Sequence, residues 1–226
     1  MQIDRLSLRG FRNYEDAQAQ FVPGVNLLVG GNANGKTNLL EAVSYLSTGR
    51  SFRTRREAEL IRFGADFAEL RAQVQSQERT RELRAVLFTG RRPRQLWLAG
   101  VRQRSRAALS GVLTSVLFCP EDLLILKKGA AGRRRLMDGV ICQLRPNYEA
   151  ALAEYGRLLD QKSALLRERY DNPSLLQVLP EYDLRMAQTG ALVISYRARY
   201  VKALAQEAAR YHRELSLIHI SEPTRH

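Results

Sequence analysis

The chain has 226 residues, of which 45% are hydrophobic and 26% charged, a composition typical of a globular protein with one or two domains. It contains no run of about 18 apolar residues and begins without the apolar stretch of a secretion signal, so we expect a cytoplasmic protein with no membrane span. The formal net charge of +13 favours a polyanionic partner, nucleic acid ahead of an anionic membrane surface, although an arginine-rich genome is an alternative explanation.

The histidines and cysteines exclude several kinds of catalysis. All three histidines, His212, His219 and His226, lie near the end of the sequence. We therefore expect neither a Ser/His/Asp or Cys/His nucleophile nor a histidine-ligated metal. Cys119 and Cys142 lack metal-ligand spacing and are interpreted as small core residues.

The N-terminal region predicts a β-hairpin, a strand, a loop and a helix. Apolar residues mark one strand over residues 3–8 and a second over 17–21. The apolar run at residues 25–29 predicts a short buried strand. From Lys36, apolar residues recur every three or four positions, which predicts an amphipathic helix that ends at Gly49.

The middle of the chain predicts antiparallel strands. Residues 83–88 and 95–98 flank a turn that is rich in glycine, proline and arginine. A short helix capped by Ser105 is expected to extend to Leu113, followed by another apolar strand over residues 115–119.

From about Arg133 the pattern changes to long helices. One carries a heptad-like stripe formed by Tyr148, Leu152, Tyr155, Leu159 and Leu166. A second covers about 175–215, and its apolar side consists of Leu184, Ala191, Ile194, Val201, Leu204, Ala208 and Tyr211. The pattern is compatible with an antiparallel helical arm and equally with an ordinary layer of packed helices.

Residues 30–37 fit the phosphate-binding pattern G-x-x-x-x-G-K-[ST] in full. They are Gly30, Gly31, Asn32, Ala33, Asn34, Gly35, Lys36 and Thr37. The glycines let backbone N–H groups curl around an anion at the start of the following helix. We expect Lys36 to reach the β- and γ-phosphates of ATP and Thr37 to ligate Mg2+. A glycine turn with no ligand is the alternative.

With its flanking sequences, this loop resembles the RecF family of recombination mediators, whose fold is an ABC-type ATPase head related to SMC and Rad50 proteins. The resemblance is carried by LSLRGFRNY at 6–14, GKTNLLEA at 35–42, TGRSFR at 48–53, FCPEDL at 118–123, KKG at 127–129 and RRRLMD at 133–138. It covers residues 1 to about 216. It implies an α/β P-loop fold with an ATP-binding lobe over residues 1–120 and a helical lobe, with an antiparallel helical arm, over 121–216.

The resemblance also implies roles for single residues. Arg12 and Asn13 would lie beside the nucleotide and Arg53 would contact a phosphate; ordinary surface arginines are the alternative for Arg12 and Arg53. Glu121 and Asp122 follow an apolar run and imitate Walker B carboxylates, but Pro120 interrupts the run. We interpret this segment as the junction between the lobes, with Mg2+ sensing as an alternative.

Family members are longer, and their signature motif and Walker B pair follow the helical lobe. Neither motif is found in this sequence, so we expect the C-terminal part of the ATPase sheet to be missing and the chain to bind ATP without hydrolysing it. Residues 217–226 break the preceding helical pattern and resemble a translated sequencing adapter. We interpret them as a non-native tail, with a genuine short tail as the alternative.

Clusters of basic residues on predicted loops and turns are candidates for contacts with DNA phosphates that do not depend on base sequence. They are Arg55 and Arg56 beside Arg53; Arg91, Arg92 and Arg94; Arg102, Arg104 and Arg106; and Lys127, Lys128, Arg133, Arg134 and Arg135. The sequence shows no helix-turn-helix, zinc finger or aromatic platform for single strands, so we do not expect readout of bases. A solvated charged surface is the alternative for each cluster.

The resemblance implies an ATP-dependent DNA-binding protein that acts in DNA repair, replication restart and the SOS response. Its implied partners are single-stranded or gapped DNA, RecR and RecO, and a second copy of itself in an ATP-dependent dimer. One alternative is another ABC-type head, of SMC, Rad50 or overcoming-lysogenisation type. A second is a small-molecule kinase, against which the helical arm and the positive charge argue.

Overall fold

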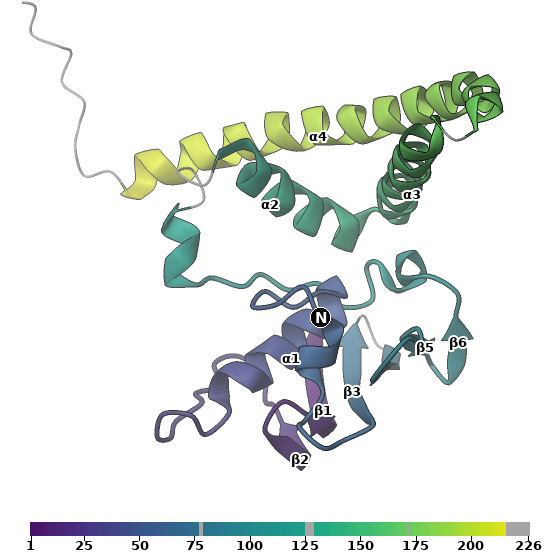
Figure 1. Ribbon diagram of the computed structural model, residues 1–226. Helices are drawn as coiled ribbons and strands as arrows, with labels where there is room; N and C mark the ends of the chain where they lie inside the picture. Colours follow the sequence, from purple (N-terminus) through teal and green to yellow (C-terminus); the bar gives the residue numbers. More distant parts are fainter. Residues whose placement is uncertain (77–78, 125–128, 171, 216–226) are drawn as a thin grey trace, which may run out of the picture. The chain divides into compact units, whose positions relative to one another are not determined.

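The computed structural model describes residues 1–76, 79–124, 129–170 and 172–215 (Figure 1). The chain divides into two compact units, Met1–Ala150 and Ala151–His226. This division lies within helix α3 (Pro146–Glu168). Helix α2 (Gly129–Leu144) stays with the first unit because a preceding loop binds its last turn: the Gly111 N–H donates to the Gln143 carbonyl at 2.7 Å.

The first unit is built on a six-stranded sheet with the order β2-β1-β3-β4-β5-β6. The strands are β1 (Gln2–Phe11), β2 (Tyr14–Gln20), β3 (Phe67–Ser76), β4 (Arg79–Phe88), β5 (Gln95–Leu98) and β6 (Val101–Gln103). Every neighbouring pair is antiparallel, which confirms the predicted hairpin and the predicted antiparallel middle region.

Helix α1 (Lys36–Thr48) packs on one face of this sheet, as Figure 1 shows. Its residues Leu39, Ala42 and Leu46 join a core of alternate strand residues such as Leu70 and Leu83. Gly49 ends the helix in a left-handed conformation with φ 64°, and its N–H donates to the Tyr45 carbonyl at 2.7 Å. The amphipathic helix and its end at Gly49 are therefore confirmed.

The strand predicted at residues 25–29 is wrong. This segment has no regular secondary structure, and Val25, Leu27 and Val29 are exposed by 91%, 82% and 82%. A strand forms only where its backbone groups pair with a neighbouring strand, and the described sheet ends at β2 and β6. The local contacts that hold the start of the segment come from the Asn26 amide, which donates to the Val22 carbonyl at 2.8 Å.

Two further predictions fail between the sheet and the helices. The helix expected from Ser105 to Leu113 is only the 3-10 helix η2 (Arg106–Leu109), and the Ser105 side chain makes no capping hydrogen bond. Residues 115–119 form no strand, and Val116 is 98% exposed. Apolar residues alone do not form strands where no partner strand is available.

Long helices dominate the rest of the chain, as predicted. The second unit contains most of α3, the 3-10 helix η4 (Pro173–Val178) and α4 (Leu179–Leu215). Ion pairs join Glu154 to Arg185 and Lys162 to Asp183, so α3 and α4 pair in opposite directions. Among the described residues, no helix combines the length and the apolar character that a bilayer span requires.

The predicted apolar side of α4 is corrected by the structure. Leu184 and Ile194 are 60% and 66% exposed, and Val201 is also exposed. Val193 is instead the buried residue of this helix, and Gly190 faces the ring of Tyr155 on α3. The helix therefore meets α3 through a different face from the one that its apolar spacing indicated.

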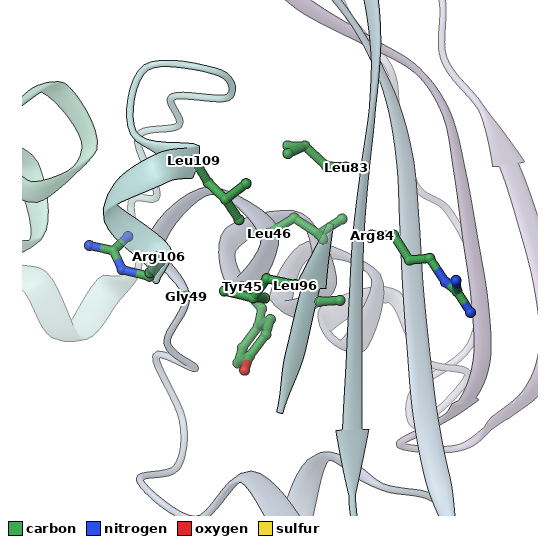
Figure 2. Close-up of a pocket in the computed structure, with 9 residues that line it drawn as sticks. Tyr45, Leu46, Gly49, Leu83, Arg84, Leu96, Arg106 and Leu109 are labelled. Atoms are coloured by element: carbon green, nitrogen blue, oxygen red, sulfur yellow. The ribbon is translucent and has the colours of Figure 1, made fainter. Parts of the chain in front are cut away.

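Gly49 lies at the edge of a small cavity lined by Leu46, Leu96 and Leu109, with Arg106 beside it (Figure 2). A Cβ atom on Gly49 would lie 2.0 Å from Cδ of Arg106, whose buried guanidinium is ion-paired with Glu149. Gly64 has a similar positive φ of 81°, but nothing lies within 4 Å of an added Cβ.

We predict that Gly49→Ala lowers the free energy of unfolding by roughly 1–2 kcal/mol more than Gly64→Ala. Both variants adopt a left-handed conformation that alanine disfavours, but only the first also displaces a buried ion pair. Urea unfolding of the two variants measures the difference. Equal losses would show that Arg106 moves aside without cost.

Candidate nucleotide-binding site

The loop at residues 30–37 joins the exposed segment 25–29 to the first turn of α1. Ala33 and Gly35 both have left-handed backbones, with φ 64° and 92°. These conformations curl the chain immediately before the helix, where the backbone N–H groups of the first turn have no intrahelical partner. The loop therefore has the local geometry of an anion cradle.

Gly35 is required by a close approach as well as by its backbone angle. An added Cβ would lie 2.7 Å from Oη of Tyr14 and 3.0 Å from Nδ2 of Asn13. The start of the β2 strand therefore packs directly against the loop. Burial in this contact raises the pKa of Tyr14.

Lys36 lies across the loop that it follows. Its Nζ donates to the carbonyls of Gly30 at 2.7 Å and Gly31 at 2.6 Å, while Thr37 is exposed at the start of α1. An ammonium group and free helix N–H groups are hydrogen-bond donors for a nucleotide phosphate, and a hydroxyl oxygen can serve as a ligand of its Mg2+. The residues present therefore fit both groups.

Glu41 joins the residues beside the loop, and sequence reasoning did not identify it. Its side chain is fully buried although it lies in the middle of α1. Arg12 donates two hydrogen bonds to the Glu41 carboxylate, from Nε to Oε2 at 2.8 Å and from Nη2 to Oε1 at 2.7 Å. Arg12 itself has a left-handed backbone, with φ 55°, and its Nη1 donates to the Glu59 carbonyl at 2.8 Å.

Two other predicted site residues, Arg53 and Asn13, are connected to the Glu41 carboxylate directly or through Asn38. Arg53 lies 3.4 Å from Glu41 and donates to Oδ1 of Asn38 at 2.7 Å. Asn38 in turn donates to Oδ1 of Asn13 at 2.8 Å. The structure thus brings Arg12, Asn13 and Arg53 together beside the first turns of α1. An acid within a half-apolar helix was the signal available in the sequence, and it is a weak one.

The charge of Glu41 is maintained by its partners. Burial by itself would raise its pKa, but hydrogen bonds from Arg12 and Ser51 and the attraction of Arg12 and Arg53 outweigh burial and lower the pKa below its usual value. A carboxylate removed from water in this way stabilises the fold only while it remains ionised and paired.

Two of the arginines named as DNA candidates are instead held inside the first unit. Arg94 is ion-paired with Glu57 and donates to the Gly49 carbonyl at 2.8 Å. Arg106 is 9% exposed and ion-paired with Glu149, and burial lowers its pKa to about 10. The structure therefore separates these two from their neighbours in sequence.

The remaining candidates for DNA contact are either exposed or outside the described residues. The exposed ones are Arg55, Arg56, Arg91, Arg92, Arg102, Arg104, Arg133, Arg134 and Arg135. Lys127, Lys128 and residues 217–226 lie outside the described residues.

Glu121 and Asp122 fall in the 3-10 helix η3 (Pro120–Leu124). Asp122 Oδ2 accepts the Cys119 N–H at 2.9 Å. Among the described residues, no group of three His, Cys, Asp or Glu is placed to hold a metal ion. The Asp122 carboxylate is thus used in a hydrogen bond within its own segment.

Comparison with known proteins finds relatives of this chain. A family profile described as "RecF/RecN/SMC N terminal domain" matches residues 2–93. The DNA replication and repair protein RecF of Symbiobacterium thermophilum is 40% identical over 217 residues, which are 96% of this chain and 56% of that protein. The chain belongs to the RecF family and matches its N-terminal portion.

Other RecF proteins show the same partial coverage. RecF of Acetivibrio thermocellus is 33% identical over 96% of this chain and 58% of its own length. The solved structure of the recombination mediator protein RecF-ATP superposes with a TM-score of 0.87 at 30% identity, over 95% of this chain and 57% of that one. A second, designated RecF-ATPrS, gives 0.87 at 29% identity, over 95% and 58%. The chain therefore has the fold of an ABC-type ATPase head and spans little more than half the length of these RecF relatives.

We predict that Glu41→Gln lowers the free energy of unfolding by about 2 kcal/mol at pH 7, because Arg12 and Arg53 lose their charged partner. A lowered pKa adds stability above the usual value of 4.5 that is lost as the pH falls through the folded-state pKa. The difference between variant and parent should therefore shrink below pH 4.5, as urea unfolding at several pH values would measure.

Glu15→Gln is the matched control, since Glu15 is 80% exposed and pairs with Arg62 at the surface. It should change stability little at any pH. A loss for Glu41→Gln that persists undiminished at low pH would mean that shape, and not charge, holds the cluster.

Proposed function

We propose that the chain binds ATP with Mg2+ and forms part of a RecF-type, ATP-dependent DNA-binding recombination mediator. The observation that carries the proposal is the loop at residues 30–37, in which the Lys36 ammonium lies against the loop carbonyls. Beside the loop lies the Glu41 cluster, by which we mean Glu41 with Arg12, Ser51 and Arg53. The solved RecF structures designated RecF-ATP and RecF-ATPrS support the choice of nucleotide. The role extends to DNA repair, replication restart and the SOS response in the cytoplasm.

Each residue of the site has a separate task in this proposal. Backbone N–H groups of residues 31–36 surround the phosphates, and Lys36 exchanges its carbonyl contacts for the β- and γ-phosphates. Thr37 ligates Mg2+, which neutralises phosphate charge. Glu41 holds Arg12 and Arg53 beside the loop, so that their orientation is fixed before the nucleotide arrives.

The remaining features belong to the whole protein. We propose an ATP-binding lobe followed by a helical lobe with an arm formed by α3 and α4, partners of RecR and RecO type, and an ATP-dependent homodimer. Hydrolysis would need the carboxylates that follow the helical lobe in the family. Glu121 and Asp122 would serve at most in sensing Mg2+.

Lys36→Met tests nucleotide binding. We expect it to weaken binding of ATP at least ~10-fold, because the variant loses the cation that faces the β- and γ-phosphates. Isothermal titration calorimetry with Mg2+ present measures the affinity, and Lys202→Met in α4 is a control with the same loss of charge. Unchanged affinity in Lys36→Met would reject the site.

Substitution of the exposed Arg55 and Arg56 tests whether these residues contact DNA phosphates. Each phosphate contact contributes about 0.7 for single strands, or 0.9 for duplex, to the slope of log affinity against log salt. We therefore expect the double variant Arg55→Gln/Arg56→Gln to reduce that slope by about 1.4–1.8, measured by fluorescence anisotropy. The exposed pair Arg199→Gln/Arg213→Gln in α4 is the control, and an equal reduction there would mean that only net charge matters.

A further inference from the structure

The sheet of the first unit has a second face, opposite α1, that is rich in arginine. We call it the open face; it carries Arg5, Ser7 and Arg9 of β1, the odd-numbered residues of β3 and the even-numbered residues of β4. Arg5, Arg9 and Arg71 on it are exposed. Figure 2 shows Arg84 on the other side of its strand from Leu83, pointing away from the core.

Three aromatic residues lie on the open face, and each has a guanidinium group beside its ring. Phe67 and Phe88 are cross-strand neighbours. Arg9 lies over the Phe67 ring at 5.6 Å, and Arg92 over the Phe88 ring at 3.8 Å.

The third ring is that of Trp97 on β5. Arg84 lies over it at 4.6 Å, and Arg102 is its cross-strand neighbour on β6. All three rings are half-buried.

The strand register places several of these residues in one row. Arg71 pairs with Arg84, Arg84 with Trp97, and Trp97 with Arg102. Across β3, β4, β5 and β6 the row is about 14 Å long, since neighbouring strands are about 4.8 Å apart. A ring within a row of cations is the arrangement by which proteins hold a single strand, with bases on the ring and phosphates on the cations.

The carboxylates on the open face orient the arginines and do not neutralise the face. Glu69 accepts from Arg71 at 2.6 Å and from Arg84 at 2.7 Å. Arginines outnumber acids on this face and its rim, with Arg5, Arg9, Arg71, Arg84, Arg92 and Arg102 against Asp16, Glu69 and Glu82. A duplex could use the charge but not the rings, because its bases already stack on one another.

We propose that the open face binds single-stranded nucleic acid, with Trp97 as a stacking platform and Arg84 and Arg102 as phosphate contacts. The proposal rests on the DNA binding proposed above and names the strand type and the surface. The rings occupy positions 67, 88 and 97 and share a face only through the strand register, so the order of residues along the chain does not reveal them as a platform.

Trp97 is the single tryptophan of the chain, so its fluorescence reports on this surface directly. We would titrate the chain with end-labelled oligo-dT and with a matched duplex, following Trp97 emission and label anisotropy together. We expect oligo-dT to quench Trp97 with the same midpoint as the anisotropy change, and the duplex to leave the emission unchanged.

Two variants complete the experiment. Trp97→Leu should weaken oligo-dT binding roughly 10-fold, and Trp97→Phe should restore most of it, because a ring remains to stack. Arg102→Gln, on the edge strand, should weaken binding and lower the salt slope, whereas Arg199→Gln in α4 should not. Thermal unfolding of each variant shows whether the fold is retained, and Arg102→Gln keeps the test decisive if Trp97→Leu does not fold.

The outcomes distinguish failure of the open-face proposal from failure of the more general proposal that this chain binds DNA. Binding by anisotropy with unchanged Trp97 emission, and full affinity in Arg102→Gln, would place DNA elsewhere and overturn the open face alone. Equal quenching by the duplex would overturn the preference for single strands. Absence of any anisotropy change would reject DNA binding by this chain altogether.

Discussion

A single buried carboxylate organises the candidate site. Glu41 lies inside the amphipathic helix α1, where a charge is unfavourable unless it is fully paired. Arg12, Arg53 and Ser51 supply that pairing from the β1–β2 turn and the loop after α1. The requirement to satisfy one charge therefore holds the β1–β2 turn and the loop after α1 against that helix, next to the α1 end of the loop at residues 30–37.

Helix α1 shows different surroundings on its two sides. Leu39, Ala42 and Leu46 are buried against the sheet, whereas Leu40 is 46% exposed. Residues 25–29, which lead into the loop, are likewise apolar and exposed. The loop at residues 30–37 is therefore held by tertiary contacts at its α1 end and only by local contacts at its other end. The Glu41 cluster and the Gly35–Tyr14 contact lie on the fixed side.

The sequence predicted the parts of the fold that depend on local pattern. Apolar runs predicted the β1–β2 hairpin and the antiparallel strands β4 and β5, and apolar spacing predicted α1 with its end at Gly49. It failed at residues 25–29 and 115–119, where apolar composition was right for a strand but no partner strand was available. It also misplaced the buried side of α4, because neighbouring helical faces with similar apolar content cannot be ranked without knowing how α3 approaches.

The loop at residues 30–37 was predicted from the sequence alone, since its spacing of glycine, lysine and threonine expresses backbone chemistry that acts within eight consecutive residues. Tertiary structure decided the rest. It showed that Glu41 joins Arg12 to Arg53, that Arg94 and Arg106 are held by internal ion pairs, and that Phe67, Phe88 and Trp97 share one face with arginines from five strands or turns. Those relations arise from strand register and from the pairing of buried charges, which bring together residues that are far apart along the chain.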